Sequence, residues 1–456
     1  MDKTVRKDKI GTGFAKAISV IILIAAATGI LILSDFIMSS YIDTSARVSI
    51  RLVLPWYLLL LILFLSFFNC FDFSGRRYHA LLYSCIFSEA LACIVVLVLP
   101  VIMVGVDLSK KAMLLNGILM CPVLALWMKI SRDMFFRLRP ISKTLLVTNG
   151  NKEKWLIDKI NKNTRIFKVE GIASPEDGDI FSVISGYDAV VIGSISAEEK
   201  HRIMGICATL EKQVLLRPEY TDIMMINAQT EQFDDLMMIR TTVFGLTTSQ
   251  RALKRTLDII LSVIAFIIAL PIMLVCALAI YIEDGHNPFY KQERLTRKGR
   301  VYHVLKLRTM VVNAEELSGP VLAEEDDPRI TKVGKFLRKV RLDELPQIIN
   351  ILKGDMSIVG PRPERDFFYD KICSVIPEFR HRLSVKAGLT GMAQVYGRYS
   401  TDPYEKLMLD LMYIQNYSIM LDIKLMIETV RVMFEKDAAK GMESDVKKRE
   451  KQENDE

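Results

Sequence analysis

Four long apolar stretches near the N-terminus constrain the fold of this chain more than any other feature. They cover residues 14–38, 52–70, 80–104 and 113–130. Each is close to the ~20 residues that a helix needs to cross a bilayer. We therefore predict a four-helix transmembrane bundle over residues 1–140. Its first helix is expected to stay as an uncleaved anchor, because no small-residue cleavage site follows it.

Basic residues indicate the orientation of this bundle. They cluster before the first stretch, between the second and third, and after the fourth. These residues are Lys3, Arg6, Lys7 and Lys9; Arg76 and Arg77; and Arg132, Arg137, Arg139 and Lys143. Because loops rich in Lys and Arg stay on the cytoplasmic side, both ends of the bundle are expected in the cytoplasm.

The composition fits a chain with separate membrane and water-facing regions, since 51% of its residues are apolar and 25% are charged. The net charge of +7 suits anionic lipid surfaces and phosphorylated substrates. It would also suit nucleic acid, but the sequence has no zinc-finger, homeodomain or RNA-binding signature, so no nucleic acid partner is expected. The seven cysteines lack metal-ligand spacing and are interpreted as buried structural thiols.

The second region, residues 141–245, has a different pattern. Short apolar runs typical of buried strands alternate with helix-like stretches, notably at 197–212, which predicts a small parallel, Rossmann-like α/β domain. The first strand ends in Thr-Asn-Gly-Asn, which is not a Gly-rich dinucleotide fingerprint. A regulatory or structural module is therefore favoured over a cofactor site. The predicted strands are 144–147, 165–171, 189–192 and 214–216.

A third region, residues 246–436, opens with an apolar segment over about 252–283. By length alone this segment would be a fifth crossing. Pro271 lies in its middle, where the missing N–H kinks or breaks a helix. Basic clusters flank both ends, beginning at Arg251 before it and at Lys291 after it. We therefore favour a re-entrant helix–break–helix hairpin that enters and leaves on the cytoplasmic face, with Pro271 at the membrane break.

The remainder of the third region is expected to be mixed, mostly helical structure. Residues 404–434 carry apolar residues at helical spacing with interleaved charges, which favours one or two interfacial amphipathic helices. The tail, 437–456, is rich in Lys, Glu and Asp and is expected to be disordered. The predicted fold class is a membrane α-helical bundle, a small Rossmann-like α/β domain and a mostly α domain with a re-entrant helix.

The densest group of charged residues surrounds Asp343 and Glu344. Asp343 is a good helix N-cap and Gly354 a good C-terminal cap, so the plain interpretation is that Asp343 only caps a helix. The chemical interpretation starts from the same position, because a helix N-terminus keeps a carboxylate ionised and also favours phosphate.

Three arginines lie near these carboxylates in the sequence. Arg338 and Arg341 precede them, and Arg362 follows within a Gly-Pro-Arg-Pro run. Guanidinium groups bind phosphate in a bidentate fork. Carboxylates and arginines in a membrane-associated domain indicate phosphoryl chemistry, with a divalent metal bridging carboxylate and diphosphate. No Cys/His or Ser/His pair in the sequence competes with this interpretation.

An ordered set of motifs runs through the third region. The pieces are Lys254-Arg255 with Asp258, Pro271, PFYKQER at 288–294, KLRTM at 306–310, RLDELPQ at 341–347, LKGDMS at 352–357, VGPRPE at 359–364, GLTGMAQVYGR at 388–398, and Asp410, Tyr413 and Asp422. This set resembles the catalytic domain of the bacterial sugar transferases, the polyprenyl-phosphate phosphoglycosyl transferases with a single-helix membrane anchor. The four spans and the α/β module resemble the large, capsule- or exopolysaccharide-initiating branch.

The resemblance implies a role for each matching position. Asp343 corresponds to a nucleophile that attacks the β-phosphorus of a UDP-sugar, and it is expected to hold a Mg²⁺ ion. Glu344 corresponds to its partner in proton handling or positioning. Pro271 corresponds to the break in the re-entrant helix. The basic residues expected to bind the substrate are Lys306, Arg308, Arg338, Arg341, Arg362 and Arg398.

The activity implied by the resemblance is transfer of a hexose-1-phosphate from a UDP-sugar, with UDP-glucose or UDP-galactose as the usual donor, to undecaprenyl phosphate. It would proceed through a covalent aspartyl-phosphosugar, release UMP and start exopolysaccharide, capsule or O-antigen synthesis at the cytoplasmic face of the bacterial inner membrane. A homodimer and polysaccharide-assembly proteins are further candidate partners. Alternatives from other classes are a catalytically inactive membrane scaffold and a nucleotide-sensing regulator that uses the α/β module.

Two positions depart from the family pattern. Thr296 stands where Gly is usual, and Ala387 stands where Pro is common before Gly388. Both are expected to change loop stiffness rather than chemistry.

Overall fold

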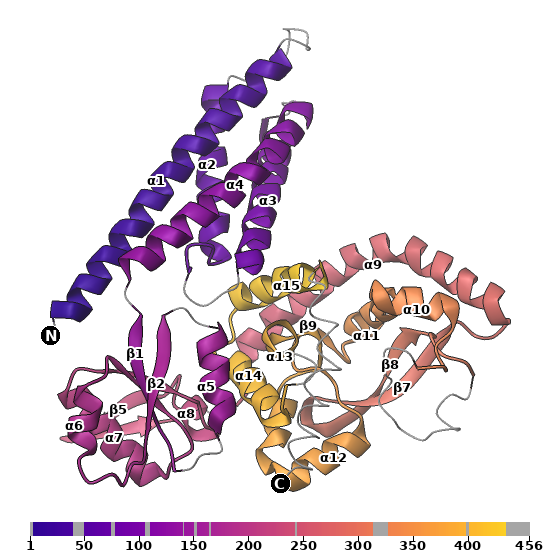
Figure 1. Ribbon diagram of the computed structural model, residues 1–456. Helices are drawn as coiled ribbons and strands as arrows, with labels where there is room; N and C mark the ends of the chain where they lie inside the picture. The colour runs from indigo at the N-terminus through magenta and orange to yellow at the C-terminus, as the bar shows by residue number, and fades with distance from the viewer. Residues whose placement is uncertain are drawn as a thin grey trace. The chain divides into compact units, whose positions relative to one another are not determined.

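The structure, a computed structural model, describes ten stretches of the chain. They are residues 3–39, 50–73, 78–104, 110–139, 141–149, 153–163, 166–241, 244–312, 327–397 and 401–434. The chain divides into two compact units, unit 1 (Met1–Arg217) and unit 2 (Pro218–Glu456), whose elements are labelled in Figure 1.

Unit 1 begins with the helices α1 (Lys3–Ser39), α2 (Ile50–Phe67), α3 (Tyr78–Val104) and α4 (Lys110–Leu138). Within the described residues, α1, α3 and α4 are long and apolar enough to cross a membrane, and so is one helix of unit 2, whereas α2 is apolar but shorter. α1 packs along α4, and α2 packs along α3. These helices form the predicted N-terminal membrane bundle.

A buried polar cluster joins three helices of the bundle. Tyr57 on α2 donates its hydroxyl hydrogen to Glu89 on α3 at 2.8 Å, and the Asn116 amide on α4 donates to the same carboxylate at 3.0 Å. All three side chains are fully buried. Because a polar group inside an apolar bundle must find its partner within the protein, these contacts fix how α2, α3 and α4 are aligned.

The rest of unit 1 is a parallel sheet with strand order β2-β1-β3-β4. The strands and the helices between them agree with the sequence-based prediction to within a few residues. β1 and β3 are buried on both faces, as expected for a parallel sheet covered by helices. The elements are β1 (Ser142–Val147), α5 (Lys154–Asn163), β2 (Phe167–Ala173), α6 (Ile180–Ser185), β3 (Ala189–Ile192), α7 (Ala197–Thr209) and β4 (Gln213–Leu216).

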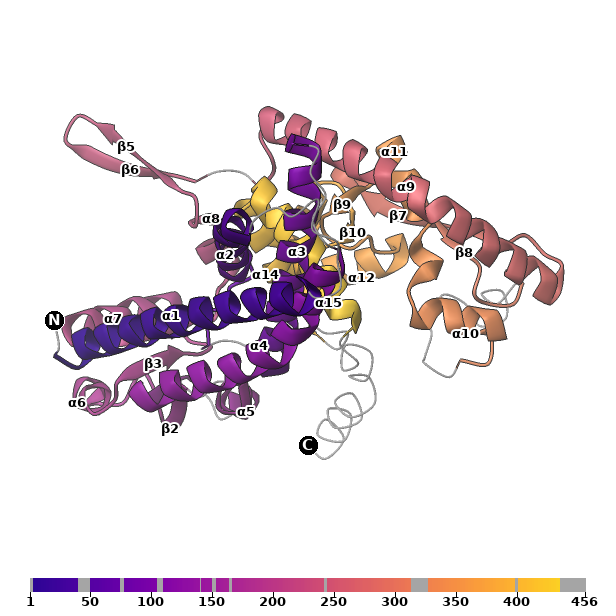
Figure 2. The same cartoon turned by 90° about the horizontal axis from the view of Figure 1, so that it is seen from above.

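Unit 2 is a mixture of helices and short strands, seen from a second direction in Figure 2. It opens with α8 (Tyr220–Met224), the exposed hairpin β5 (Gln229–Phe233) and β6 (Leu236–Arg240), and the long helix α9 (Thr248–Asp284). An antiparallel hairpin follows, formed by β7 (Phe289–Thr296), the 3-10 turn η3 (Arg297–Gly299) and β8 (Arg300–Leu307).

The C-terminal half of unit 2 is mostly helical. Its strands β9 and β10 pair in parallel. The elements are α10 (Lys332–Lys339), η4 (Leu342–Glu344), α11 (Gln347–Lys353), β9 (Ser357–Val359), α12 (Asp366–Val375), η5 (Pro377–Ser384), β10 (Gly388–Thr390), α13 (Met392–Tyr396), α14 (Pro403–Gln415) and α15 (Ile419–Phe434).

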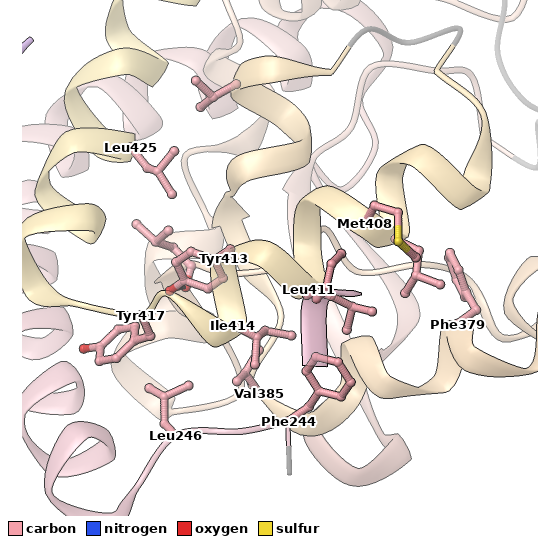
Figure 3. Packing of buried hydrophobic residues seen from close by; sticks show 14 residues of the cluster. Phe244, Leu246, Phe379, Val385, Met408, Leu411, Tyr413, Ile414, Tyr417 and Leu425 are labelled. Carbon is pink, nitrogen blue, oxygen red and sulfur yellow. Dashed lines mark hydrogen bonds between the residues drawn. The ribbon is translucent and has the colours of Figure 1, made fainter. Parts of the chain in front are cut away.

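The largest hydrophobic core of unit 2 surrounds α14, and Figure 3 shows its side chains. Leu411 and Ile414 on this helix are almost fully buried, together with Phe244 and Leu246 from the segment before α9. Ile223 of α8 belongs to the same core. Ile223 and Phe244 therefore pack in the core of unit 2, although the sequence-based prediction placed residues up to 245 in the α/β module.

Helix α9 runs unbroken over 37 residues, so the interruption predicted at Pro271 does not divide it into two helices. The proline still removes one main-chain hydrogen bond, and Figure 1 shows the helix arched. Thr247 and Gln250 form a capping box at its N-terminus, and Gly285, with φ 71°, ends it. At 1.5 Å per residue the helix is about 55 Å long, well beyond the ~30 Å apolar thickness of a bilayer.

Two helices, α14 and α15, occupy the predicted amphipathic stretch. α14 lies inside unit 2 rather than on its surface, because η5 and α8 cover the face that the sequence alone would leave open. The seven cysteines are free thiols; five are buried, as predicted, whereas Cys121 and Cys373 are partly exposed. The tail predicted to be disordered, residues 437–456, lies outside the described residues.

Candidate active site

Asp343 and Glu344 lie in the single turn η4, between α10 and α11. The residue before this turn, Arg341, has φ 58°, in the left-handed region that residues other than glycine rarely adopt. α11 begins only at Gln347, so the predicted role of Asp343 as the N-cap of this helix is wrong. The predicted C-terminal cap at Gly354, with φ 91°, is confirmed. The strained turn places two adjacent carboxylates outside a regular helix.

Glu344 is the centre of a cluster of basic side chains. Its Oε1 accepts a hydrogen bond from Arg362 Nη2 at 3.0 Å, with Arg341 Nη1 at 3.9 Å and Lys306 Nζ at 4.0 Å. Burial alone would raise the pKa of Glu344, but these three cations lower it to about 2. Glu344 is therefore ionised at physiological pH.

Asp343 has a different environment from its neighbour. It is 9% exposed, and its Oδ1 is buried without a hydrogen-bond partner among the described residues. Burial and the adjacent charge of Glu344 raise the pKa of Asp343, and the nearby cations, chiefly Lys306, oppose this rise. The expectation that a helix N-terminus would favour its charged form is thus wrong. Neighbouring carboxylates with pKa values moved in opposite directions are typical of reactive sites.

Arg338 reaches the turn from the end of α10. Its Nε donates to Thr309 Oγ1 at 2.8 Å. Gly334 allows α10 to lie directly on the main chain at Thr309, because a Cβ at this position would collide with the Thr309 carbonyl. The end of β8, which carries Lys306, and α10 are both in contact with η4. Two cations from separate elements are thereby held next to the carboxylates.

Arg362 follows β9 and is held through its main chain. A Cβ on Gly388 of β10 would strike the main chain of Gly360, and a Cβ on Gly360 would strike the Lys386 carbonyl. Arg382 Nη2 donates to the Arg362 carbonyl at 3.1 Å, and Arg382 Nε donates to Asp410 at 2.7 Å. The Arg382 and Asp410 side chains are 5% and 1% exposed, so this ion pair is internal.

The sequence identified Asp410 as a motif residue but missed Arg382, which lies in none of the motifs that carry the resemblance. A buried carboxylate at position 410 requires a cationic partner, and that requirement is the one signal from which Arg382 could have been sought.

Of the remaining predicted site residues, two lie apart from the carboxylate turn and one lies outside the described residues. Arg308 forms a two-pronged ion pair with Asp284 at the end of α9, with distances of 2.5 and 2.6 Å, and its Nε donates to the Asn287 carbonyl. It therefore joins β8 to α9. Pro271 lies in the middle of α9. Arg398 lies outside the described residues.

Several other motif residues make internal contacts. Lys254 on α9 forms an ion pair with Asp422 on α15 at 2.6 Å, and the Tyr413 hydroxyl donates to the same carboxylate at 2.7 Å. Asp258 accepts a hydrogen bond from Ser357 Oγ at 2.8 Å. These contacts fasten the N-terminal half of α9 to β9, α14 and α15, so these residues hold the fold.

The two departures from the family pattern contact each other. Thr296 Oγ1 accepts a hydrogen bond from the Ala387 N–H at 3.2 Å and donates to the Asp355 carbonyl at 2.8 Å. A proline at position 387 has no N–H to donate, and a glycine at position 296 has no hydroxyl. The departures therefore act together as one buried hydrogen-bonded unit.

Asp343 also offers a suitable ligand for magnesium. Its buried Oδ1 lacks a partner among the described residues, and Mg²⁺ is usually held by one or two carboxylates together with substrate phosphate oxygens. The described residues contain no group of three His, Cys, Asp or Glu side chains that could hold a metal without such a substrate. Asp343 could therefore hold such an ion through this oxygen.

Comparison with known proteins gives matches in unit 2. The family described as "Bacterial sugar transferase" matches residues 249–436, which include the whole carboxylate turn and its basic neighbours.

Named relatives match a similar length of the chain. The chain is 38% identical to the UDP-glucose:undecaprenyl-phosphate glucose-1-phosphate transferase of Caulobacter vibrioides over 193 residues, which are 41% of this chain and 71% of that protein. It is 39% identical to the UDP-N-acetylgalactosamine-undecaprenyl-phosphate N-acetylgalactosaminephosphotransferase of Aeromonas hydrophila over 184 residues, 40% of this chain and 43% of that protein.

A third relative matches a slightly longer stretch. The chain is 36% identical to the UDP-glucose:undecaprenyl-phosphate glucose-1-phosphate transferase of Escherichia coli K12 over 222 residues, 48% of each chain. The match therefore spans less than half the length of the Aeromonas and Escherichia proteins.

Proposed function

This chain belongs to the bacterial sugar transferase family, and from that membership we propose that it transfers a hexose-1-phosphate from a UDP-sugar to undecaprenyl phosphate and releases UMP. The observation that carries the proposal is the Asp343–Glu344 turn with four cations around two carboxylates, which leaves a net positive site suited to a diphosphate. The cations are Lys306, Arg338, Arg341 and Arg362. The named relatives support a UDP-hexose donor, and UDP-glucose and UDP-galactose are our first candidates.

The proposed reaction has two balanced steps. The Asp343 carboxylate first attacks the β-phosphorus of the UDP-sugar; the bond to the bridging oxygen breaks, and UMP leaves with the electron pair. A phosphate oxygen of undecaprenyl phosphate then attacks the same phosphorus of the aspartyl-phosphosugar, and the Asp343 carboxylate is restored. No proton needs to move, because the charge lost by each nucleophile reappears on the leaving group.

The two carboxylates contribute differently to these steps. Glu344 stays charged and holds Arg362 and Lys306 near the diphosphate position, so its main role is to position cations. Burial and the charge of Glu344 raise the pKa of Asp343, and a carboxylate of higher pKa is the stronger nucleophile when it is ionised; its buried Oδ1 also has no competing hydrogen bond among the described residues. A magnesium ion bound by Asp343 and the donor would neutralise phosphate charge as the two anions approach.

We propose that α9 is re-entrant and lies at the cytoplasmic face of the bacterial inner membrane, and its contacts support a return to the side from which it starts. Near its N-terminus Lys254 binds Asp422, and at its C-terminal end Asp284 binds Arg308. Both ends of the helix therefore contact the same folded unit, whereas a straight crossing would separate them by the thickness of a bilayer.

The middle of α9 supports the same placement. Ile267 and Val275, on either side of Pro271, are 67% and 70% exposed, which is costly in water and favourable in lipid. We propose that α9 dips into the membrane and returns, with its arch at Pro271.

Thiol labelling tests this topology. Cysteines introduced at the exposed positions Arg251 and Lys291, in a chain whose native cysteines are replaced, should both resist an impermeant reagent added to intact cells and react after lysis. Labelling of Lys291→Cys alone from outside would mean that α9 crosses the membrane.

The parallel strand order of the second half of unit 1 supports a Rossmann-like module, for which we propose a structural or regulatory role. A homodimer and contacts with polysaccharide-assembly proteins stay predictions.

A donor panel tests the proposed reaction. Membranes containing the full chain are supplied with undecaprenyl phosphate, Mg²⁺ and one UDP-sugar at a time, and the release of UMP is measured together with the lipid product. At least one UDP-hexose should give both products, and membranes containing Asp343→Asn should give neither. Absence of UMP with every UDP-sugar would refute the proposal.

A further inference from the structure

A second concavity lies in unit 2, apart from the carboxylate turn. It is a cleft of about 520 Å³ formed by the η3 turn, the start of α12, and η5. Its size lies in the range of small-molecule sites. Its wall combines basic and aromatic side chains with one carboxylate: Lys298, Arg380, His381, Phe244, Tyr369 and Asp366.

The aromatic side of this cleft is firmly built. The His381 ring lies against Tyr220 and Phe244, with ring centroids 5.4 and 5.7 Å apart. Tyr369 lies against Phe379, with centroids 5.9 Å apart. These contacts fix the rings from behind, so the wall is preformed for a flat apolar group.

The basic side is open to a ligand. Lys298 is at the tip of the β7–β8 hairpin with φ 62°, and its side chain is exposed. Arg380 is exposed as well, and its Nε donates to the Pro377 carbonyl at 2.9 Å, which orients the guanidinium. With Asp366 as the acidic member of the wall, the cleft favours an anion.

The cleft adjoins the proposed diphosphate site. A small cavity lined by Arg362 shares Leu295, Tyr369 and Leu383 with the wall of the cleft. Asp366 follows Arg362 by four residues, a distance that a fully extended chain covers in about 14 Å at most. A ligand with its diphosphate at Arg362 can therefore place its other end in the cleft.

We propose that this cleft binds the nucleoside end of the donor, with the base on the aromatic wall and the ribose and α-phosphate near Lys298 and Arg380. This assignment rests on the proposed function. A base is a flat π-system that stacks on aromatic rings, and its phosphate is an anion for the basic side. Figure 1 shows α12, at the cleft, and α9, at the proposed membrane face, on opposite sides of unit 2, so the water-soluble donor and the lipid acceptor approach from different directions.

Binding of UMP to the purified full chain in detergent tests this assignment without turnover. Arg380→Gln and Lys298→Gln should each weaken UMP binding about fivefold to tenfold, since each removes one charged contact. They should raise the KM for the UDP-sugar by a similar factor and leave kcat within about twofold. Lys371→Gln, which removes one positive charge from an exposed position of α12 outside the cleft wall, is the matched control and should bind UMP like the wild type.

Uridine and inorganic phosphate separate the two halves of the proposed ligand. Uridine should displace UMP from the wild type, and phosphate at the same concentration should displace it less well. If uridine does not compete, or if both cleft variants bind UMP like the wild type, the nucleoside assignment is overturned. That result leaves the proposed function intact as long as the wild type releases UMP in the donor panel. If instead no UDP-sugar gives UMP in the panel but UMP binding still depends on Arg380, the proposed function is refuted and the cleft remains a nucleotide-binding site.

Discussion

Unit 2 contains two kinds of charged cluster, and they differ in their balance of positive and negative charge. In the pairs Lys254–Asp422 and Arg382–Asp410 every side chain is less than 10% exposed, and each charge has a close partner of opposite sign. In the turn at Asp343 and Glu344 four cations surround two carboxylates, and the backbone is strained. A buried carboxylate oxygen without a partner among the described residues occurs in both kinds of cluster, at Asp343 and at Asp410.

The difference separates structural from reactive members of one motif set. The free-energy cost of removing a charged side chain from water is offset only when a partner of opposite charge is well placed. A buried ion pair therefore fixes the relative position of the two elements that carry it. A site that must bind a diphosphate needs instead an excess of positive charge. Asp422 and Asp343 both belong to the motif set, but Asp422 belongs to a structural ion pair and Asp343 to the proposed reactive turn.

The largest expected effect contrasts these two aspartates. Asp343→Asn should lower kcat for UMP release at least about 1,000-fold, as loss of a nucleophile does, while the apparent Tm changes little because its Oδ1 has no partner to lose. Asp422→Asn should instead lower the Tm, because Lys254 is left buried without its ion-pair partner. Kinetics and thermal unfolding of both variants check this, and a reversal of the two phenotypes would break the comparison.

A second prediction concerns the pH dependence. Glu344→Gln should lower turnover about 100-fold through misplaced cations. Because the charge of Glu344 raises the pKa of Asp343, its removal should also move the acidic limb of the kcat/KM profile to lower pH. Glu293→Gln, at an exposed position on β7, serves as the control with an unchanged limb. A limb that stays in place or moves to higher pH would show that Asp343 does not control it.

A third prediction uses the internal pair behind Arg362. Asp410→Asn should destabilise unit 2 by about 3 kcal/mol, as expected for a broken buried ion pair, and raise the donor KM about tenfold through displacement of Arg362. Arg382→Lys keeps the charge but cannot reach both Asp410 and the Arg362 carbonyl. Its stability should therefore be closer to that of the wild type than the stability of Asp410→Asn, while its donor KM should stay raised. If both its stability and its KM are close to the wild-type values, Arg382 only supports the fold.

The sequence predicted much of this architecture because the signals were local. Apolar stretches of helical length located α1, α3 and α4, and strand-like runs located β1 to β4. The chemistry-bearing pair Asp343 and Glu344 was found through its charged surroundings and the family resemblance. The helix N-cap was wrongly placed at Asp343 because the left-handed turn at Arg341, which delays α11 to Gln347, depends on tertiary packing that has no local sequence signal.

Long-range pairs were the other features beyond reach. The family resemblance predicted Arg308 as a substrate-binding residue, yet in the structure its guanidinium forms an ion pair with Asp284, 24 residues earlier. Arg382 and Asp410 are 28 residues apart, and no periodic pattern joins them. Such partners follow from how β8, α9, η5 and α14 pack, which a single sequence does not encode in its local pattern.

The smallest predicted effect is a change in stability at Thr296 and Ala387, the two positions that depart from the family pattern. Ala387→Pro removes the N–H that binds Thr296 and should cost about 1 kcal/mol. Thr296→Gly should cost a comparable amount alone, but the double variant should cost less than the sum, because each single change already breaks the same hydrogen bond. Thermal unfolding of the four chains measures this coupling, and strictly additive effects would mean that the two positions are independent.

The most direct test of the account is the intact mass of the purified full chain after incubation with a UDP-hexose and Mg²⁺ in the absence of undecaprenyl phosphate. We predict that the wild type gains the mass of one hexose phosphate on the peptide that contains Asp343, and that the added lipid removes it. Asp343→Asn should gain nothing. A wild-type preparation that turns over with the lipid but never carries this adduct, together with ternary-complex rather than ping-pong kinetics, would contradict the account and indicate direct attack by the lipid phosphate.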